Sequence, residues 1–82
     1  MSTLSNNLHK PVAMATKVSC DDDMLHVDLS DGRKISVPLE WFPILAKATE
    51  KQRKDWSLIG NGIGIHWEEI DEDISIKSLL IS

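Results

Sequence analysis

One stretch of the chain concentrates the side chains whose types could do chemistry. Residues 62 to 75, GIGIHWEEIDEDIS, place His66 just before a run of carboxylates. The acids of this run, called the acidic stretch, are Glu68, Glu69, Asp71, Glu72 and Asp73. Imidazole and carboxylate groups bind divalent metals and transfer protons in catalysis. The stretch is therefore either a reactive or metal-binding site or the acidic outer wall of a small domain.

The known zinc spacings do not fit His66. His66 and Glu68 supply the His-x-Glu of zinc deaminases, but that site also needs a downstream pair of cysteines, and the single cysteine, Cys20, lies upstream. A helical zinc protease needs a second histidine four positions later, where this chain has Ile70. Neither zinc class is predicted.

An EF-hand calcium site is not predicted either. An EF-hand loop that began at Asp71 would need glycine and glutamate where Ile76 and Ser82 stand. Weak surface binding of a divalent ion by Asp71 and Asp73 stays open. The favoured interpretation is structural: the acids keep a strand end hydrated, Asp73 stabilises the start of a following helix, and His66 points outward without a placed partner.

Other catalytic signatures are absent from the sequence. No G-x-S-x-G elbow or cysteine motif supplies a nucleophile. The glycines at 60, 62 and 64 are not followed by the GK[ST] of a phosphate loop, so they indicate a hairpin turn. Cys20 is interpreted as a small buried hydrophobic residue. We expect neither an enzyme nor a cofactor.

Hydrophobic residues alternate with polar ones through the first half of the chain, which is typical of half-buried strands. The alternating residues are Val18, Cys20, Leu25, Val27, Leu29, Ile35, Val37 and Leu39. Asp31-Gly32 lies between the second and third segments and predicts a two-residue hairpin turn with Gly32 at positive φ. The result is a three-stranded antiparallel meander whose register depends on that turn.

The pattern changes after Pro38. Pro43 fits the first turn of a short helix, with Ile44 and Leu45 on its buried side. Thr49 followed by Gln52 predicts a capping box that opens a second helix. That helix carries a basic patch of Lys51, Arg53 and Lys54. The tryptophans are expected in the core, with Trp41 the strongest candidate for the surface.

The second half predicts another hairpin and then an acidic loop. Trp56 and Leu58 alternate before the Gly-Asn-Gly turn, and Ile63, Ile65 and Trp67 alternate after it. A short helix is expected from about residue 75. The predicted fold class is α+β, an antiparallel sheet made of the three-stranded meander plus a second hairpin, with short helices on one face. Residues 1–11 are expected to be a flexible lead-in to a single domain at 12–82.

Composition narrows the class of protein. The chain has 82 residues, 41% hydrophobic and 27% charged, which suits one small globular core. The formal net charge of −4 argues against direct nucleic acid binding, which needs clustered cations. A single cysteine fits a reducing compartment, and no apolar run approaches the roughly 20 residues that span a bilayer. We expect a cytoplasmic protein without a membrane segment.

Three segments resemble a known bacterial family. They are LSDGRKISVPLEWFPIL, ATEKQRKDWSLIGNGIGIHW and EEIDEDISIKSLL. Together they resemble domain-of-unknown-function family 2442, whose members commonly carry Pro where this chain has Glu68. The resemblance implies a compact α+β domain without an established activity. It also implies regulation through a partner protein, because some members are fused to a helix-turn-helix and others lie beside a small protein in toxin–antitoxin-like pairs.

Three functional hypotheses follow. The leading one is a non-enzymatic interaction or regulatory module, the accessory or neutralising half of a two-protein system, that binds another protein through Trp41, the basic patch or the acidic stretch with His66. The second is a phage-type inhibitor whose acidic stretch imitates the phosphates of nucleic acid. The third is a small metal-binding protein that uses His66, Asp71 and Asp73.

Overall fold

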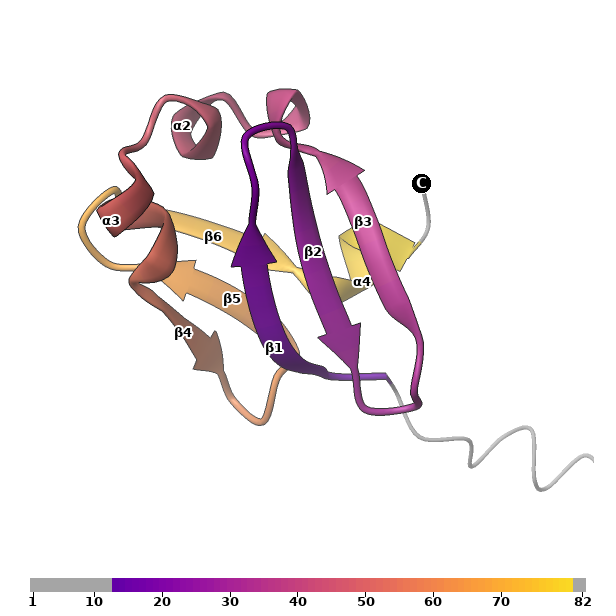
Figure 1. Ribbon diagram of the computed structural model, residues 1–82. Helices are drawn as coiled ribbons and strands as arrows, with labels where there is room; N and C mark the ends of the chain where they lie inside the picture. Colours follow the sequence, from indigo (N-terminus) through magenta and orange to yellow (C-terminus); the bar gives the residue numbers. More distant parts are fainter. Residues whose placement is uncertain (1–12, 81–82) are drawn as a thin grey trace, which may run out of the picture.

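The computed structural model describes residues 13 to 80 (Figure 1). The lead-in expected at residues 1–11 and the last two residues, 81 and 82, lie outside this range. One sheet has the order β1 (Ala15–Cys20), β2 (Met24–Leu29), β3 (Lys34–Pro38), and the other has the order β4 (Trp56–Ile59), β5 (Gly64–Trp67), β6 (Glu72–Ser75). The helices are η1 (Leu39–Trp41), α2 (Pro43–Ala46), α3 (Glu50–Lys54) and α4 (Ile76–Leu80). All strand pairs are antiparallel, which confirms the predicted α+β class.

The second sheet has a strand that the sequence interpretation missed. The stretch taken for an acidic loop contains β6, where Ile74 is buried and pairs with Ile65 of β5. The expected role of Asp73 at a helix start is also wrong, since Asp73 lies within this strand. Ser75 takes that role instead, because its Oγ accepts a hydrogen bond of 3.1 Å from the backbone N–H of Ser78.

A bulge in β1 places Ala15 and Val18 on the same buried side although they are three positions apart. Ala15 pairs with Leu29, whereas Lys17 pairs with Asp28, so Thr16 is the extra residue. An extra residue reverses the alternation of the strand locally. The core face therefore begins earlier in the chain than the alternating pattern indicated.

The turn between β2 and β3 is longer than predicted. The backbone N–H of Leu29 donates to the carbonyl of Arg33 at 2.8 Å, so the loop contains Ser30, Asp31 and Gly32 and is not a two-residue turn. Gly32 has the expected positive φ, at 93°. This three-residue loop pairs Val27 with Ile35, so the apolar residues of the two strands share one face, whereas a two-residue turn would have paired Val27 with Ser36. Asp31 braces it by accepting from the backbone N–H and the Nε of Arg33.

The turn between β4 and β5 joins the two halves of the molecule. Ile63 lies in this turn with 53% of its surface exposed, so its expected place in the alternating strand is wrong. The carbonyl of Gly62 accepts a 2.8 Å hydrogen bond from the N–H of Ala15 in β1. The carbonyl of Ile63 accepts from the N–H of Ile76 at the start of α4. One turn thus contacts both β1 and α4.

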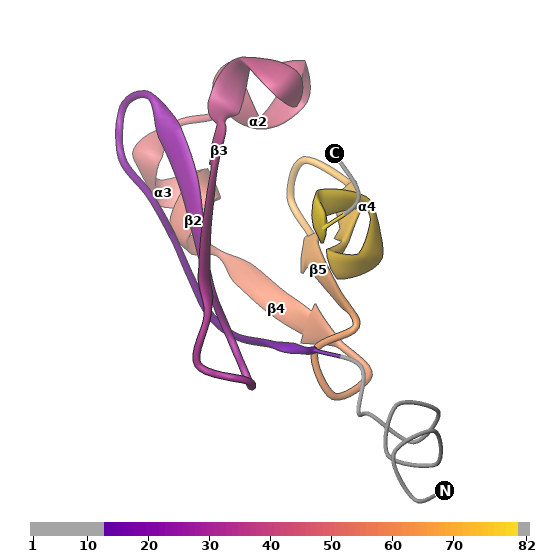
Figure 2. The same ribbon diagram turned by 90° about the vertical axis from the view of Figure 1, so that its right-hand side faces the viewer.

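The core lies between the two sheets. Figure 2 shows the β1–β3 sheet nearly edge-on, with β5 and α4 on one side of it. The fully buried large side chains come from both sheets and from the helices between and after them: Trp67, Leu25, Leu45, Ile65, Ile76 and Val27. In α2 only Leu45 is buried. Ile44 was expected on the same buried side, but it is 51% exposed, because a helix of one turn directs only one of these two adjacent side chains to the core. No helix within residues 13 to 80 is long and apolar enough to cross a membrane.

Candidate functional site

His66 has the placed partners that the sequence interpretation did not foresee. It lies in β5 directly opposite Asp73 of β6. Its Nδ1 contacts Asp73 Oδ1, and its Nε2 lies 2.9 Å from Glu68 Oε1. The imidazole points outward, as expected, but only 26% of the side chain is exposed. Two carboxylates therefore hold the ring from opposite ends.

This arrangement shifts the pKa of His66. The hydrogen bond to Asp73, and then the one to Glu68, raise the pKa of His66 above its ordinary value, while partial burial opposes them. Each ring nitrogen contacts a carboxylate oxygen, so neither is free to bind a metal. Among residues 13 to 80, no three His, Cys, Asp or Glu side chains are arranged to hold a metal ion.

The rest of the acidic stretch is divided between separate contacts. Glu69 accepts a 3.0 Å hydrogen bond from Gln52 Nε2, which ties the β5–β6 loop to α3. Glu72 accepts from the backbone N–H of Asp73 at 3.2 Å. Asp71 occupies the loop itself at a φ of 52°. Because these acids lie in a turn and a strand and serve different partners, they do not converge on a common centre.

The basic patch is also divided, because Arg53 turns inward. Its Nε donates to the carbonyl of Leu45 at 3.1 Å, and its Nη2 donates to the carbonyl of Ala46 at 2.7 Å. These carbonyls lie at the end of α2, where a helix leaves its last carbonyls without intrahelical donors, and the Leu45 carbonyl also accepts from the N–H of Ala48 at 3.1 Å. The carbonyl of Arg53 in turn accepts from Trp67 Nε1 at 3.0 Å. Arg53 therefore connects α2, α3 and the buried Trp67 through hydrogen bonds.

The capping box predicted at Thr49 is present in α3. The Oγ1 of Thr49 accepts from the N–H of Gln52 at 3.1 Å, and Gln52 Oε1 accepts from the N–H of Thr49 at 2.9 Å. Lys51 and Lys54 remain at the surface of this helix. Lys54 forms an exposed ion pair of 3.4 Å with Glu50. With Arg53 engaged inside, the basic patch presents lysines only.

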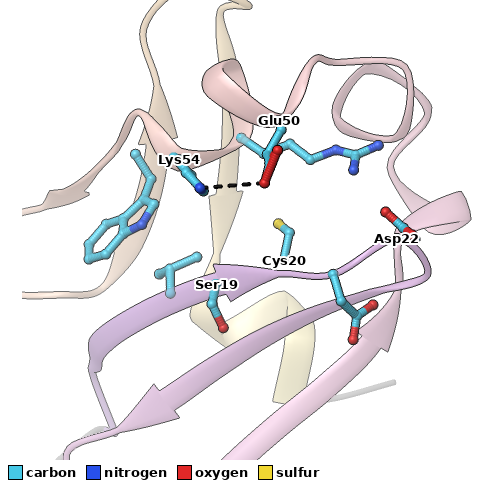
Figure 3. A pocket seen from close by; sticks show the side chains of 9 residues that line it. Ser19, Cys20, Asp22, Glu50 and Lys54 are labelled. Carbon is cyan, nitrogen blue, oxygen red and sulfur yellow. Dashed lines mark ion pairs between the residues drawn. The ribbon is translucent and has the colours of Figure 1, made fainter.

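A pocket of about 260 Å³ lies between the end of β1 and α3 (Figure 3). The pocket is lined by Val18, Ser19, Cys20, Asp21, Asp22, Glu50, Arg53, Lys54 and Trp56. Figure 3 shows the thiol of Cys20 on the side of the pocket that faces α3. Burial raises the pKa of the Cys20 thiol and outweighs the opposing effect of Arg53. A protonated thiol is a poor nucleophile, so this site does not indicate cysteine chemistry.

Sequence reasoning missed a hydrogen-bonded chain on the outer face of the first sheet. His26 Nδ1 lies 2.6 Å from Ser36 Oγ, and His26 Nε2 lies 2.8 Å from Asp21 Oδ2. The other oxygen of Asp21 accepts from the N–H groups of Asp23 and Met24. The bond to His26, followed by these backbone bonds, lowers the pKa of Asp21 to about 2. The signal was available, because the meander pairs His26 with Ser36 on its polar face.

Serine, histidine and aspartate in this order resemble a nucleophile, its base and the group that orients the base. Catalysis also requires a place for substrate and donors for the developing oxyanion. Neither His26 nor Ser36 lines this pocket or the groove described next. We therefore assign the chain of contacts to holding the β1–β2 turn against the sheet.

The largest exposed side chains near a concave surface belong to η1 and α2. Trp41 is 52% exposed and Ile44 is 51% exposed. A groove of about 370 Å³ runs beside these elements and reaches the β1–β2 turn. The groove is lined by Asp22, Asp23, Met24, Pro38, Leu39, Glu40 and Ala46. The sequence predicted only Trp41 of this region at the surface. The groove was not predicted, because its lining residues come from segments that are distant in the chain.

Fold and surface together define a class: a small α+β domain of two antiparallel three-stranded sheets whose polar clusters hold the fold together. The chain belongs to the family described as "Protein of unknown function (DUF2442)", which matches residues 15–81 and confirms the resemblance found in the sequence.

A solved structure shows the same fold. The crystal structure of a protein of unknown function from Rhodospirillum rubrum ATCC 11170 is similar to this chain, with a TM-score of 0.74 and 29% sequence identity. The similarity covers 85% of this chain and 87% of that one. Comparison with curated proteins finds no match.

Proposed function

We propose that this domain is a non-enzymatic module that binds and regulates another protein in the cytoplasm, as one half of a two-protein, toxin–antitoxin-like pair. The observation that carries the proposal is the exposure of Trp41 and Ile44 on the adjoining η1 and α2. Tryptophan is enriched at the energetic centres of protein interfaces, where burial of its large ring contributes most. The domain has few large aromatic side chains, yet about half of the surface of Trp41 lies outside the core.

The polar clusters support a binding role over a catalytic one. His66, His26 and Arg53 each have two side-chain contacts within the domain. Groups engaged in this way stabilise the fold and are not poised toward a substrate. A binding surface is therefore expected among exposed side chains outside these polar clusters.

The nucleic-acid mimic is less well supported than the protein-binding module. A phosphate mimic needs unpaired negative charges along its face. In the acidic stretch, Glu68 and Asp73 share the His66 imidazole and Glu69 contacts Gln52. These contacts occupy three of the five acids that a mimic would have to present.

The test is a pull-down from native bacterial lysate with wild type, Trp41→Ala/Ile44→Ala and the control Ile63→Ala. Ile63 is 53% exposed and lies in the β4–β5 turn, away from η1 and α2. We expect a near-stoichiometric protein partner that the double variant loses and the control keeps. Circular dichroism checks that each variant is folded. A partner retained equally by the double variant, or the absence of any partner across growth conditions, overturns the proposal.

A further inference from the structure

We propose that the groove between the β1–β2 turn and η1–α2 receives a cationic side chain, arginine or lysine, from the partner protein. This inference rests on the proposed function and assigns the chemistry of the partner's contact. The groove, of about 370 Å³, lies at the lower end of the roughly 300–1,000 Å³ typical of ligand pockets. It therefore suits one long side chain better than a bulky cofactor.

The floor of the groove is apolar. Met24, Pro38 and Ala46 are half-buried there, and Leu39 is buried. Lysine and arginine carry methylene stems that pack on apolar surface while the charged end stays near water. A floor of this kind matches the stem of such a side chain.

The rim of the groove is acidic. Asp22, Asp23 and Glu40 are exposed residues that line it. Within residues 13 to 80, no lysine, arginine or histidine forms an ion pair with any of the three. The neighbouring Asp21 differs, because its carboxylate is engaged by His26. Three like charges around one apolar floor favour a cation as the occupant.

The groove is braced before any partner arrives. Asp21 accepts from the N–H groups of Asp23 and Met24 at 2.8 and 2.7 Å, which fixes the turn that carries two of the acids. The carbonyl of Asp23 accepts from the N–H of Leu39 at 2.8 Å, so the two walls are joined directly. A preformed site loses less conformational entropy on binding.

The residues beside the groove indicate which side chains of the partner would flank the cation. Glu40 of the rim is followed by Trp41 in η1, and Ala46 of the floor shares α2 with Ile44. The same two elements thus carry the groove lining and the two exposed apolar side chains. The matching segment of the partner has one arginine or lysine between apolar residues.

The probe is the blocked peptide acetyl-Leu-Arg-Leu-amide, titrated into ¹⁵N-labelled protein and followed by amide chemical shifts. Its matched control replaces arginine with citrulline, which keeps the shape and removes the charge. We expect saturable shifts at residues 22 to 24, 39, 40 and 46 with the arginine peptide, and none with the citrulline peptide. Added salt should weaken the binding.

Two triple variants separate a specific groove from general attraction of charge. Asp22→Asn/Asp23→Asn/Glu40→Gln removes the rim and should weaken binding about tenfold or more. Glu69→Gln/Asp71→Asn/Glu72→Gln makes the same change in net charge elsewhere and should weaken it much less. Equal losses in the two variants, equal binding of both peptides, or no saturable shift at the groove would overturn the inference.

The outcomes also distinguish this inference from the proposed function. If the arginine peptide fails but Trp41→Ala/Ile44→Ala still loses a lysate partner, the groove assignment is wrong and the binding module stands. If the peptide binds in the groove but no variant loses a partner, the cationic site stands and the proposed function fails.

Discussion

At the scale of the residue, His66 contacts two acids, one on the neighbouring strand and one close to it in the sequence. Asp73 reaches it across the β5–β6 pair, and Glu68 reaches it from two positions further along. Both contacts are strongest when the imidazole is protonated and both acids are ionised. The protonation of His66 therefore reports directly on this arrangement.

We predict that the imidazole of His66 titrates above its ordinary value, and that Asp73→Asn lowers its midpoint more than Glu68→Gln does. The hydrogen bond to Asp73 is the larger cause of the raised pKa and the one to Glu68 is the smaller. The measurement is a ¹H–¹⁵N NMR titration of the ring nitrogens. Equal midpoints in wild type and Asp73→Asn would show that the contact does not form in solution.

The same shift predicts how stability depends on pH. The folded pKa of His66 is raised, so the stabilisation is fully present below the unfolded pKa near 6.5 and is lost as pH rises through the folded pKa. We expect thermal melts of wild type to lose stability across that window, and His66→Gln to lose less. If His66→Gln shows the same pH slope as wild type, another group is responsible.

Arg53 offers a second prediction at this scale, with Lys54 as its matched control. Arg53→Gln removes the guanidinium donors from the carbonyls of Leu45 and Ala46, of which Leu45 keeps the backbone N–H of Ala48, and hydrogen bonds to charged groups contribute about 1.5–3 kcal/mol each. Lys54→Gln removes the same charge from an exposed ion pair and should change little. Urea denaturation of the two variants measures the difference. Similar midpoints for both would refute the role of Arg53 in connecting α2, α3 and Trp67.

At the scale of the element, two hairpin turns contain glycines at positive φ, but only one is packed against the rest of the molecule. Gly32 has a φ of 93° and open space where a Cβ would lie. Gly62 has a φ of 112°, and a Cβ there would lie 2.3 Å from the carbonyl oxygen of Ala15. The strain at Gly32 is therefore local, whereas any side chain at Gly62 separates β1 from the β4–β5 turn.

We predict that Gly62→Ala destabilises the domain clearly more than Gly32→Ala. The left-handed backbone alone costs a residue with a Cβ about 1–2 kcal/mol, which is the expected loss at Gly32. Gly62→Ala adds a clash with backbone that cannot rotate away. Thermal melts compare the two, and Gly60→Ala, which meets only the side chain of Ile63, serves as a further control. Equal melting temperatures for Gly62→Ala and Gly32→Ala would contradict the account.

At the scale of the whole molecule, the two sheets share one core. Buried residues from β2, such as Leu25 and Val27, belong to the same cluster as Ile65 and Trp67 from β5. A sheet with one apolar face has to bury that face against another layer, and here the buried residues of each sheet belong to the cluster shared with the other. The sheets are therefore expected to unfold together.

We predict a single cooperative transition in Trp41→Phe/Trp56→Phe, in which the fully buried Trp67 of the second sheet is the remaining fluorophore among residues 13 to 80. Tryptophan fluorescence and far-ultraviolet circular dichroism should give the same urea midpoint, because one probe follows the second sheet and the other follows both. A fluorescence midpoint clearly below that of circular dichroism would mean that the second sheet opens separately.

Local patterns determined much of this fold without any knowledge of the tertiary structure. Alternation from Val18 to Leu39 predicted the meander, because a strand with one buried face repeats every two residues. Thr49 and Gln52 predicted the start of α3, because the capping box needs only neighbours three positions apart. Exposed Trp41 followed from its position next to Phe42-Pro43.

Only the tertiary structure decided which distant groups meet. Strand β6 was hidden because its apolar position, Ile74, shows its role only when it is paired with Ile65. The contacts of His66 with Asp73 and of Arg53 with the end of α2 join residues whose spacing in the chain matches no local motif. The acidic groove likewise requires the β1–β2 turn to lie against η1 and α2. Sequence periodicity reports the environment of each residue along its own element, whereas a site between elements is set by how the sheets pack over their shared core.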